Sequence, residues 1–127
     1  LNMIFPILAG YFYGPISGGM AGLVGTSISA LVVPNIFDAM SILPHTLMGI
    51  AAGWAGASRS QFVAAISIVI GHALNILFYC RFNLLVIDHP DTLIVGLTAE
   101  TTIDVVATIL MIVLLQKWLY KETGQRW

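Results

Sequence analysis

Charged residues are scarce in this chain. Only 9% of its 127 residues are Asp, Glu, Lys or Arg, whereas 58% are hydrophobic, and the mean hydropathy is +0.93. A soluble domain of this length needs a mainly polar surface, which so few polar residues cannot supply. The formal net charge of -1 and the absence of a basic run give no indication of a nucleic-acid partner.

Cysteine and catalytic motifs are equally sparse. Cys80 is the single cysteine, so the chain forms no internal disulfide. The sequence has no histidine pair at metal-ligand spacing, no nucleophile elbow and no phosphate-binding loop with its lysine. We therefore expect no enzymatic activity, no bound metal and no cofactor. Any active transport would depend on energy supplied by a partner.

What the chain does have is five apolar segments, which predict an all-α integral membrane protein. We expect a polytopic helical bundle that forms a single transmembrane domain over residues 1–127. The first segment covers only about 20 Å at 1.5 Å per residue, short of the roughly 30 Å hydrocarbon core. It is either truncated or a short element shielded by its neighbours. The predicted spans lie near 1–13, 16–33, 44–58, 61–79 and 101–120, separated in part by loops at 35–41 and 80–100.

Small residues recur at helical spacing in the second and third spans. Such ridges let helices approach closely where lipid removes the hydrophobic drive for association. Pro44 is expected in the first turn of the third span, a favourable place for proline. The residues predicted to form helix-packing contacts are Gly14, Gly18, Gly22, Gly25, Gly49 and Gly53.

Basic residues determine the expected orientation. The C-terminal tail carries Lys117, Lys121 and Arg126, which predicts that it is cytoplasmic in a prokaryotic plasma membrane. Arg59 then also lies inside, and the two acidic loops that follow the second and fourth spans lie outside. The N-terminus would start outside, which fits a missing preceding helix.

Polar side chains inside the spans are the candidates for function, because an ionisable group at mid-bilayer costs roughly 3 kcal/mol and should face the bundle or water. In the fourth span, Ser67, Gly71, Asn75 and Tyr79 share one helix face, with His72 beside it. This face would line a cavity. The alternative for His72 is a neutral core histidine that donates to a neighbouring helix.

The fifth span opens with Glu100, Asp104 and Thr108 on one face. A cationic or hydrogen-bond-donating ligand would suit the two carboxylates. The alternative is helix-end electrostatics, because acids in a first turn complement the positive end of the helix dipole. That alternative explains Glu100 well but Asp104, one turn deeper, less well.

Polar residues near the start of the third span lie at the same predicted outer end. A polar pocket with aromatic walls, open to one side, is the usual form of a small-molecule site. Alternatively, Asn35 and Asp38 are solvated interface residues. The predicted substrate-binding residues are Asn35, Asp38, His45, Asn75, Tyr79, Glu100 and Asp104.

Two segments resemble the substrate-binding S components of energy-coupling factor (ECF) type vitamin transporters. LAGYFYGPISGGMAGLVGTSISAL, residues 8–31, has an apolar helix, a Gly14-Pro15 turn and a glycine-rich helix, and is similar to the family's second and third helices. LPHTLMGIAAGWAG, residues 43–56, is similar to its short fourth helix. The resemblance implies a six-helix bundle with both termini cytoplasmic, of which this chain would hold five spans and lack the first.

The resemblance also implies a function. The bundle would bind a vitamin or similar micronutrient from the outer side and deliver it by toppling in the lipid bilayer. Its expected partners are a transmembrane coupling subunit and two ATPase subunits, which supply the energy.

A second interpretation is a multi-span membrane sensor domain of a signalling receptor, of the LytS type. Such regions also contain L-x-G-x-x-x-G-P-x-x-G hairpins, a pattern that residues 8–18 match. A sensor would continue past Trp127 into a signalling domain. A third interpretation, a structural subunit without a ligand, is disfavoured because the polar groups gather at one end.

Overall fold

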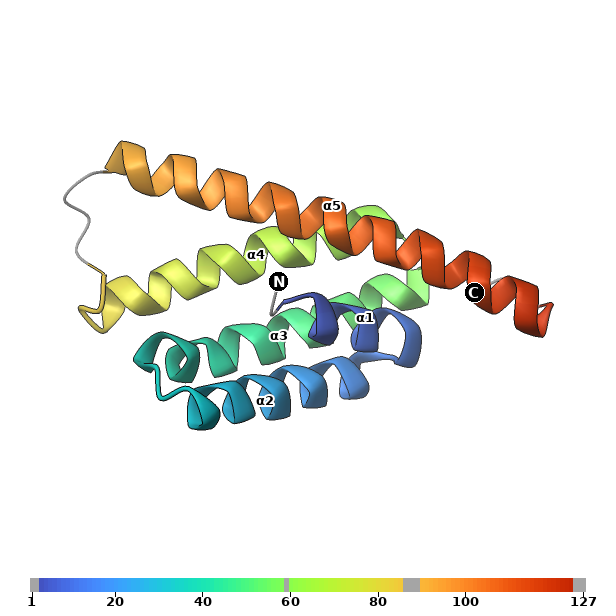
Figure 1. Cartoon of the computed structure of the whole chain (residues 1–127), viewed down its shortest axis with the longest axis horizontal. Coiled ribbons are helices and arrows are strands. Elements are labelled where there is room, and N and C mark those ends of the chain that lie inside the picture. The colour runs from blue at the N-terminus through green and yellow to red at the C-terminus, as the bar shows by residue number, and fades with distance from the viewer. Residues whose placement is uncertain (1–2, 59, 86–89, 125–127) are drawn as a thin grey trace.

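Five α-helices form the described part of the chain and confirm the predicted all-α bundle (Figure 1). A computed structural model gives the structure of residues 3–58, 60–85 and 90–124. Arg59 and Arg126, which support the predicted orientation, lie outside these residues. The helices are α1 (Ile4–Tyr13), α2 (Pro15–Val32), α3 (Ile36–Ser58), α4 (Gln61–Arg81) and α5 (Pro90–Thr123).

Four of these helices, α2 to α5, are long and apolar enough to cross a membrane. Their outward faces carry exposed Ile, Leu, Val and Phe side chains along most of their length. In water such faces would form apolar patches far larger than those of soluble monomers, whereas in a bilayer they contact lipid. The protein is therefore a multi-pass membrane protein.

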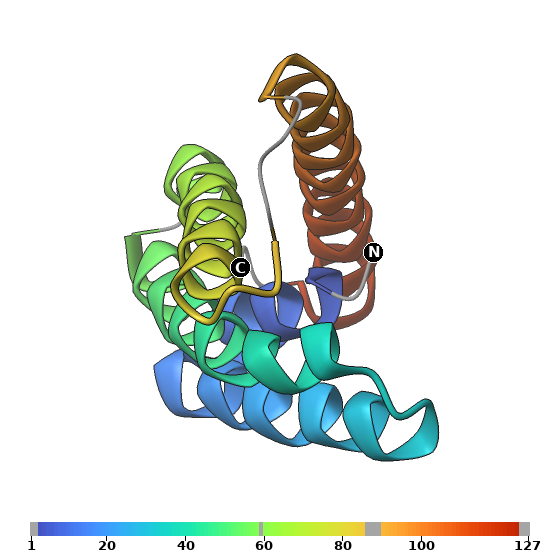
Figure 2. The same ribbon diagram turned by 90° about the vertical axis from the view of Figure 1, so that its left-hand side faces the viewer.

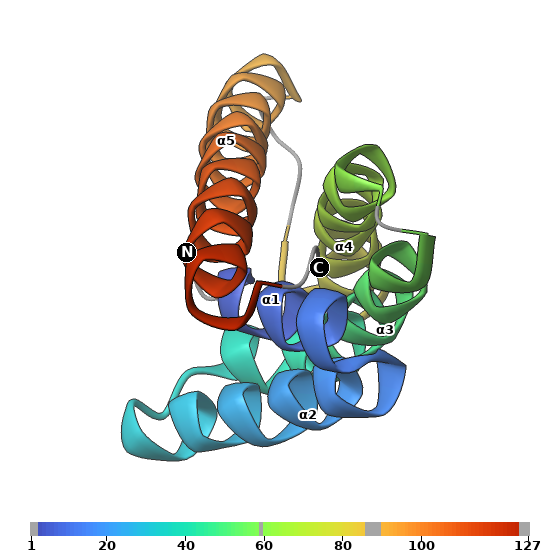
Figure 3. The same ribbon diagram turned by 90° about the vertical axis from the view of Figure 1, so that its right-hand side faces the viewer.

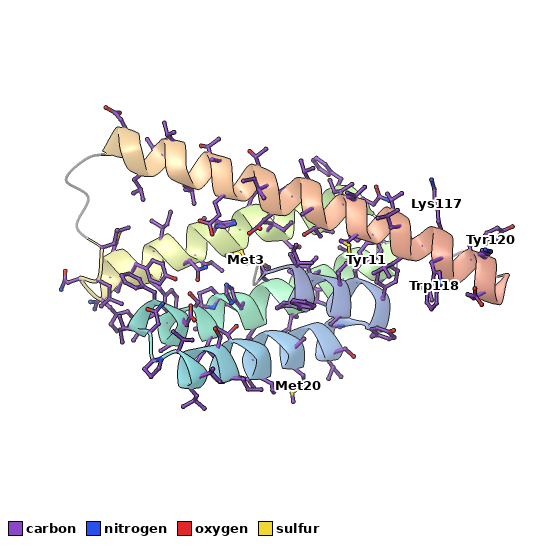
Figure 4. The ribbon with its side chains drawn as sticks, viewed as in Figure 1. Met3, Tyr11, Met20, Lys117, Trp118 and Tyr120 are labelled. Carbon is purple, nitrogen blue, oxygen red and sulfur yellow. The ribbon has the colours of Figure 1, made fainter. Side chains whose placement is uncertain are left out.

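The short helix α1 is shielded by its neighbours, which is one of the two alternatives open for the first segment. With 10 residues it is too short to span, and it contacts all four other helices. Ile7 is fully buried, and the hydroxyl of Tyr11 accepts a hydrogen bond from Gln116 Nε2 of α5 at 3.3 Å. Figure 4 shows Tyr11 directed from α1 toward α5, whereas Lys117, Trp118 and Tyr120 extend from the far end of α5.

Backbone contacts between glycines hold α1, α2 and α3 together. A Cβ added at Gly18 would overlap the backbone of Gly49 on α3 and of Gly10 on α1. One added at Gly22 would overlap the backbone of His45, and one at Gly53 would overlap that of Pro15. Only residues without a side chain permit this approach, because the neighbouring atoms are main chain and cannot rotate away.

Two of the predicted packing glycines differ from the others: Gly14 meets Gly53 only through its own backbone, and Gly25 makes no such contact. An added Cβ would meet no described atom within 4 Å at either position. Gly14 has a φ of +93° and forms the turn between α1 and α2, and Pro15 occupies the first turn of α2. Gly25 is exposed because it is three residues after Gly22, whereas Thr26, four residues after Gly22, is buried against α3.

Helix α3 begins at Ile36, so the predicted loop at 35–41 is wrong. Asn35 Oδ1 accepts a hydrogen bond from the Phe37 backbone N–H at 2.9 Å, and Asp38 lies in the first turn. These are the features of a helix N-terminus. Pro44 is consequently inside the helix rather than in its first turn. Proline is tolerated there because neighbouring helices compensate for the lost backbone hydrogen bond.

Helix α5 begins at Pro90, ahead of the predicted span, and replaces much of the predicted loop at 80–100. Proline in the first turn and Asp91 beside it favour a helix start. Figures 2 and 3 show α5 standing apart from α2 and α3. Within the described residues, α5 contacts only α4 and α1.

Candidate functional site

A cavity of about 360 Å³ lies between α4 and α5, toward the end of the bundle where α4 ends and α5 begins. Figure 2 views this end and shows the two helices apart. The polar lining residues are His72, Asn75 and Tyr79 of α4 and Glu100 of α5. The other described lining residues are Met3, Ile76, Leu85, Leu93, Gly96 and Leu97. The cavity thus combines a mainly apolar wall with a few polar groups, as small-molecule sites do.

Asn75 belongs to a polar chain that crosses three helices. Its Nδ2 lies 3.5 Å from Nε2 of His45 on α3, and His45 Nδ1 lies 2.8 Å from the hydroxyl of Thr26 on α2. All three side chains are buried. Because an amide nitrogen only donates, Nε2 is the acceptor and Nδ1 carries the proton that His45 donates to Thr26.

The amide oxygen of Asn75 is itself buried and has almost no accessible surface. Asn75 is 7% exposed, and its Oδ1 has no hydrogen-bond partner among the described residues. An unsatisfied buried carbonyl costs about 1–3 kcal/mol. Asn75 therefore lines the cavity, and beneath the cavity surface it holds an acceptor that no described residue satisfies.

His72, which lines the cavity, and Asp104, which does not, connect α4 to α5. His72 Nε2 lies 3.3 Å from Asp104 Oδ2, and both residues are buried. One turn further along α5, Thr108 is fully buried, and its hydroxyl has no partner in the part of the chain that the structure describes. A carboxylate paired with an imidazole inside a membrane segment is the kind of group that is retained for function.

Tyr79 closes the cavity against the start of α3. Its hydroxyl donates to the carbonyl of Phe37 at 3.2 Å and also contacts the hydroxyl of Ser41. The Phe37 and Tyr79 rings meet edge to face, with centroids 5.1 Å apart. Since the phenol proton is engaged with α3, a lone pair of the Tyr79 oxygen is what it offers to a ligand.

The seven predicted binding residues fall into three groups. Asn75, Tyr79 and Glu100 line the cavity, and His45 and Asp104 lie behind it in contact with Asn75 and His72. Asn35 and Asp38 are not among its described lining residues: Asn35 caps α3, and Asp38 accepts a hydrogen bond from Ser29 of α2 at 2.7 Å. These two join helix ends rather than forming the cavity wall.

Several residues of the site are not among the seven predicted binding residues. His72 contacts a neighbouring helix, as the core-histidine alternative expects, but it also lines the cavity. Its position three residues before Asn75 was the available signal. Thr26 and Ser41 carry no local signal, because their partners lie 19 and 38 residues away in the sequence.

The other cavities and surface depressions have no ionisable side chain among their described lining residues. A cavity of about 180 Å³ between α1 and α2 is lined by Phe5, Pro6, Ala21 and Gly25, with Thr26 and Ser29 as its polar members. Two shallow depressions lie on the outer faces of α5 and of α2 with α3, and their walls are largely apolar. Such faces suit acyl chains. The described residues contain no group of three His, Cys, Asp or Glu that could hold a metal ion.

Comparisons of the chain with protein-family models, curated proteins and solved structures gave no match.

Proposed function

We propose that this protein is the membrane-embedded substrate-binding subunit of an ECF-type ABC transporter, and that it takes up a vitamin or similar micronutrient. The observation that carries the proposal is the cavity between α4 and α5, which is lined by Asn75, a residue whose buried amide oxygen has no partner among the described residues. A buried acceptor without a partner is costly, and a bound substrate would satisfy it.

The arrangement of the helices supports the same proposal. A binding subunit must hold its pocket on a stable frame, and the glycine contacts among α1, α2 and α3 provide one. The sequence has no phosphate-binding loop, so energy would come from partners. In this proposal these are a transmembrane coupling subunit and two ATPase subunits.

The experiment is to purify the natural protein in mild detergent without added ligand and to identify small molecules released on denaturation by mass spectrometry. We expect one stoichiometric vitamin-like compound. Asn75→Ala should carry much less of it, whereas Ser67→Ala, a buried polar change on the same helix two turns away, should carry as much as wild type. If both variants carried as much compound as wild type, Asn75 and this part of α4 would not belong to the binding site.

The proposed direction of uptake places the cavity end outside and the C-terminus in the cytoplasm of a prokaryotic cell. Lys117 and Lys121 lie at the opposite end of α5 from the cavity. Cys80 lies near the cavity end of α4, so an impermeant thiol reagent should label it on whole cells. As a control, Ser58→Cys with Cys80→Ser, at the other end of the bundle, should react only after lysis. The reverse pattern would invert the orientation.

A sensor domain of the LytS type is the second candidate, favoured by the length of α5. Its 34 residues extend about 51 Å, well beyond the roughly 30 Å hydrocarbon core. Figure 1 shows its C-terminal part running past the other helices, as a helix leading to a further domain would. The natural reading frame distinguishes the two: several hundred residues after Trp127 would favour the sensor.

A further inference from the structure

We infer that the cavity between α4 and α5 takes a small organic cation: an ammonium, or a similar group rich in N–H donors, on an apolar body. The inference rests on the proposed binding function and adds the chemical class of the substrate.

The first argument is the hydrogen-bonding capacity of the polar wall. Asn75 directs its donor nitrogen toward His45 and leaves its oxygen without a described partner. The hydroxyl proton of Tyr79 is engaged with the Phe37 carbonyl or with Ser41 on α3. Glu100, when ionised, only accepts. The wall therefore presents acceptors, and the complementary ligand brings donors.

The second argument is charge. Glu100 contributes a carboxylate, and none of the described lining residues is Lys or Arg. His72, the remaining nitrogen-bearing ring in the wall, lies 3.3 Å from the carboxylate of Asp104 and so does not stand as a lone positive group. An anionic ligand would thus lie near the Glu100 carboxylate without a cationic partner in the described wall, which like-charge repulsion disfavours. A cationic ligand would instead be attracted to the Glu100 carboxylate, and no described lining Lys or Arg would repel it.

The third argument is the apolar remainder of the wall. Met3, Leu85, Leu93 and Leu97 surround the polar groups, and the volume of about 360 Å³ lies in the range of small-molecule pockets. An inorganic ion would leave this surface without a partner. An organic body attached to the cationic group would fill it.

The test uses three probes with a shared phenyl body and different head groups: 2-phenylethylammonium, 2-phenylethanol and 3-phenylpropionate. Their binding is measured by calorimetry on detergent-purified protein washed free of co-purified small molecules. We expect the ammonium to bind about tenfold more tightly than the alcohol, because charge-assisted hydrogen bonds are the stronger ones. The carboxylate should bind more weakly than either.

Two variants locate the preference. Glu100→Gln should reduce the advantage of the ammonium over the alcohol severalfold while leaving the alcohol affinity nearly unchanged. Glu122→Gln is the matched control, since it removes the same charge from the exposed far end of α5. A preference that survives Glu100→Gln but is lost in Glu122→Gln would overturn the assignment.

The outcomes separate this inference from the proposed function. Carboxylate binding as tight as that of the ammonium, or a co-purified anion without N–H donors, would overturn the cation class but leave a substrate-binding subunit. Absence of any co-purified compound together with no binding of the three probes would overturn both. A co-purified cation supports both, even if the simple probes bind weakly.

Discussion

Helices α2 and α3 meet through glycine backbones, whereas α4 and α5 are separated at one end by a cavity and joined through polar side chains. On the glycine side a single added methyl group would overlap main-chain atoms. On the cavity side, a Cβ added at Gly96 of α5 would meet no described atom within 4 Å. The same residue type therefore serves opposite purposes in the two regions.

The difference shows how a small membrane protein can be both rigid and receptive. Close packing of α1, α2 and α3 replaces the hydrophobic drive that lipid removes, and it leaves a cavity only half the volume of the one between α4 and α5. Helix α5, which contacts only α4 and α1 within the described residues, is less constrained. A part that must open for a substrate is expected to come from the less tightly packed region.

The largest predicted effect comes from a substitution in the close contacts among α1, α2 and α3. Gly18→Val would place its side chain against the backbones of Gly49 and Gly10, and main-chain atoms cannot move aside without separating the helices. We expect a loss of about 3 kcal/mol or more in the free energy of unfolding, measured by denaturation with SDS in mixed micelles. Poor recovery of folded protein is the corresponding result in cells.

Gly25→Val is the control for this change, because its side chain would enter open space on the same helix. It should unfold within about 1 kcal/mol of wild type, since helix propensity differs little beyond that. Similar destabilisation by the two substitutions would show that valine, rather than its position, is the cause.

The contrast between the two regions also explains what could be predicted from the sequence. Close contacts follow from residue size and period, so Gly18, Gly22, Gly49 and Gly53 were recognisable as a packing surface. Gly14 also meets Gly53, through its own backbone, whereas Gly25 is three residues after Gly22 and leaves the contact face, where Thr26, four residues after Gly22, is buried instead. A step of three instead of four was enough to turn Gly25 out of the contact, although α3 still reaches α2 at Thr26 and Ser29.

The helix starts and the site were harder to predict. Asn35 followed by Asp38 is a helix-start signal, but Pro44 suggested a later beginning. The pairs His45 with Thr26 and His72 with Asp104 depend on how each helix is rotated about its axis. That rotation is a property of the assembled bundle, so the sequence predicted most of the polar residues but not their partners.

The next effect concerns the polar link between α4 and α5. His72→Ala and Asp104→Ala each remove one side of a buried contact at 3.3 Å and should each lower the free energy of unfolding. Because Asp104 makes a further interaction, the double-mutant cycle is the proper measurement. We expect a coupling energy of about 1 kcal/mol, typical of polar pairs between membrane helices. Additive losses would mean that the pair does not hold the helices together.

A smaller effect is expected at Thr26, where the hydrogen-bonded series Asn75–His45–Thr26 reaches α2. Thr26→Val keeps the shape of the side chain but removes the hydroxyl that accepts from His45 Nδ1 at 2.8 Å. The loss should be about 1 kcal/mol in the free energy of unfolding. Ser27→Ala, next to it but only half-buried, should change little. Since His45 orients Asn75, Thr26→Val should also weaken binding of the co-purified compound, which a purely structural role would not do.

The smallest effect on stability is expected from a substitution in the cavity between α4 and α5, and it tests directly whether this cavity binds the substrate. Gly96→Leu adds a side chain to α5 where a Cβ meets no described atom, and leucine favours a helix over glycine by up to about 1 kcal/mol. Stability should therefore stay equal or rise slightly, as measured by the same SDS titration. Because Gly96 lines the cavity, the new side chain should occupy part of its volume and reduce co-purified ligand strongly. A variant that is stable and still fully loaded would place the substrate elsewhere, and the contrast between a rigid and a receptive side would no longer describe function.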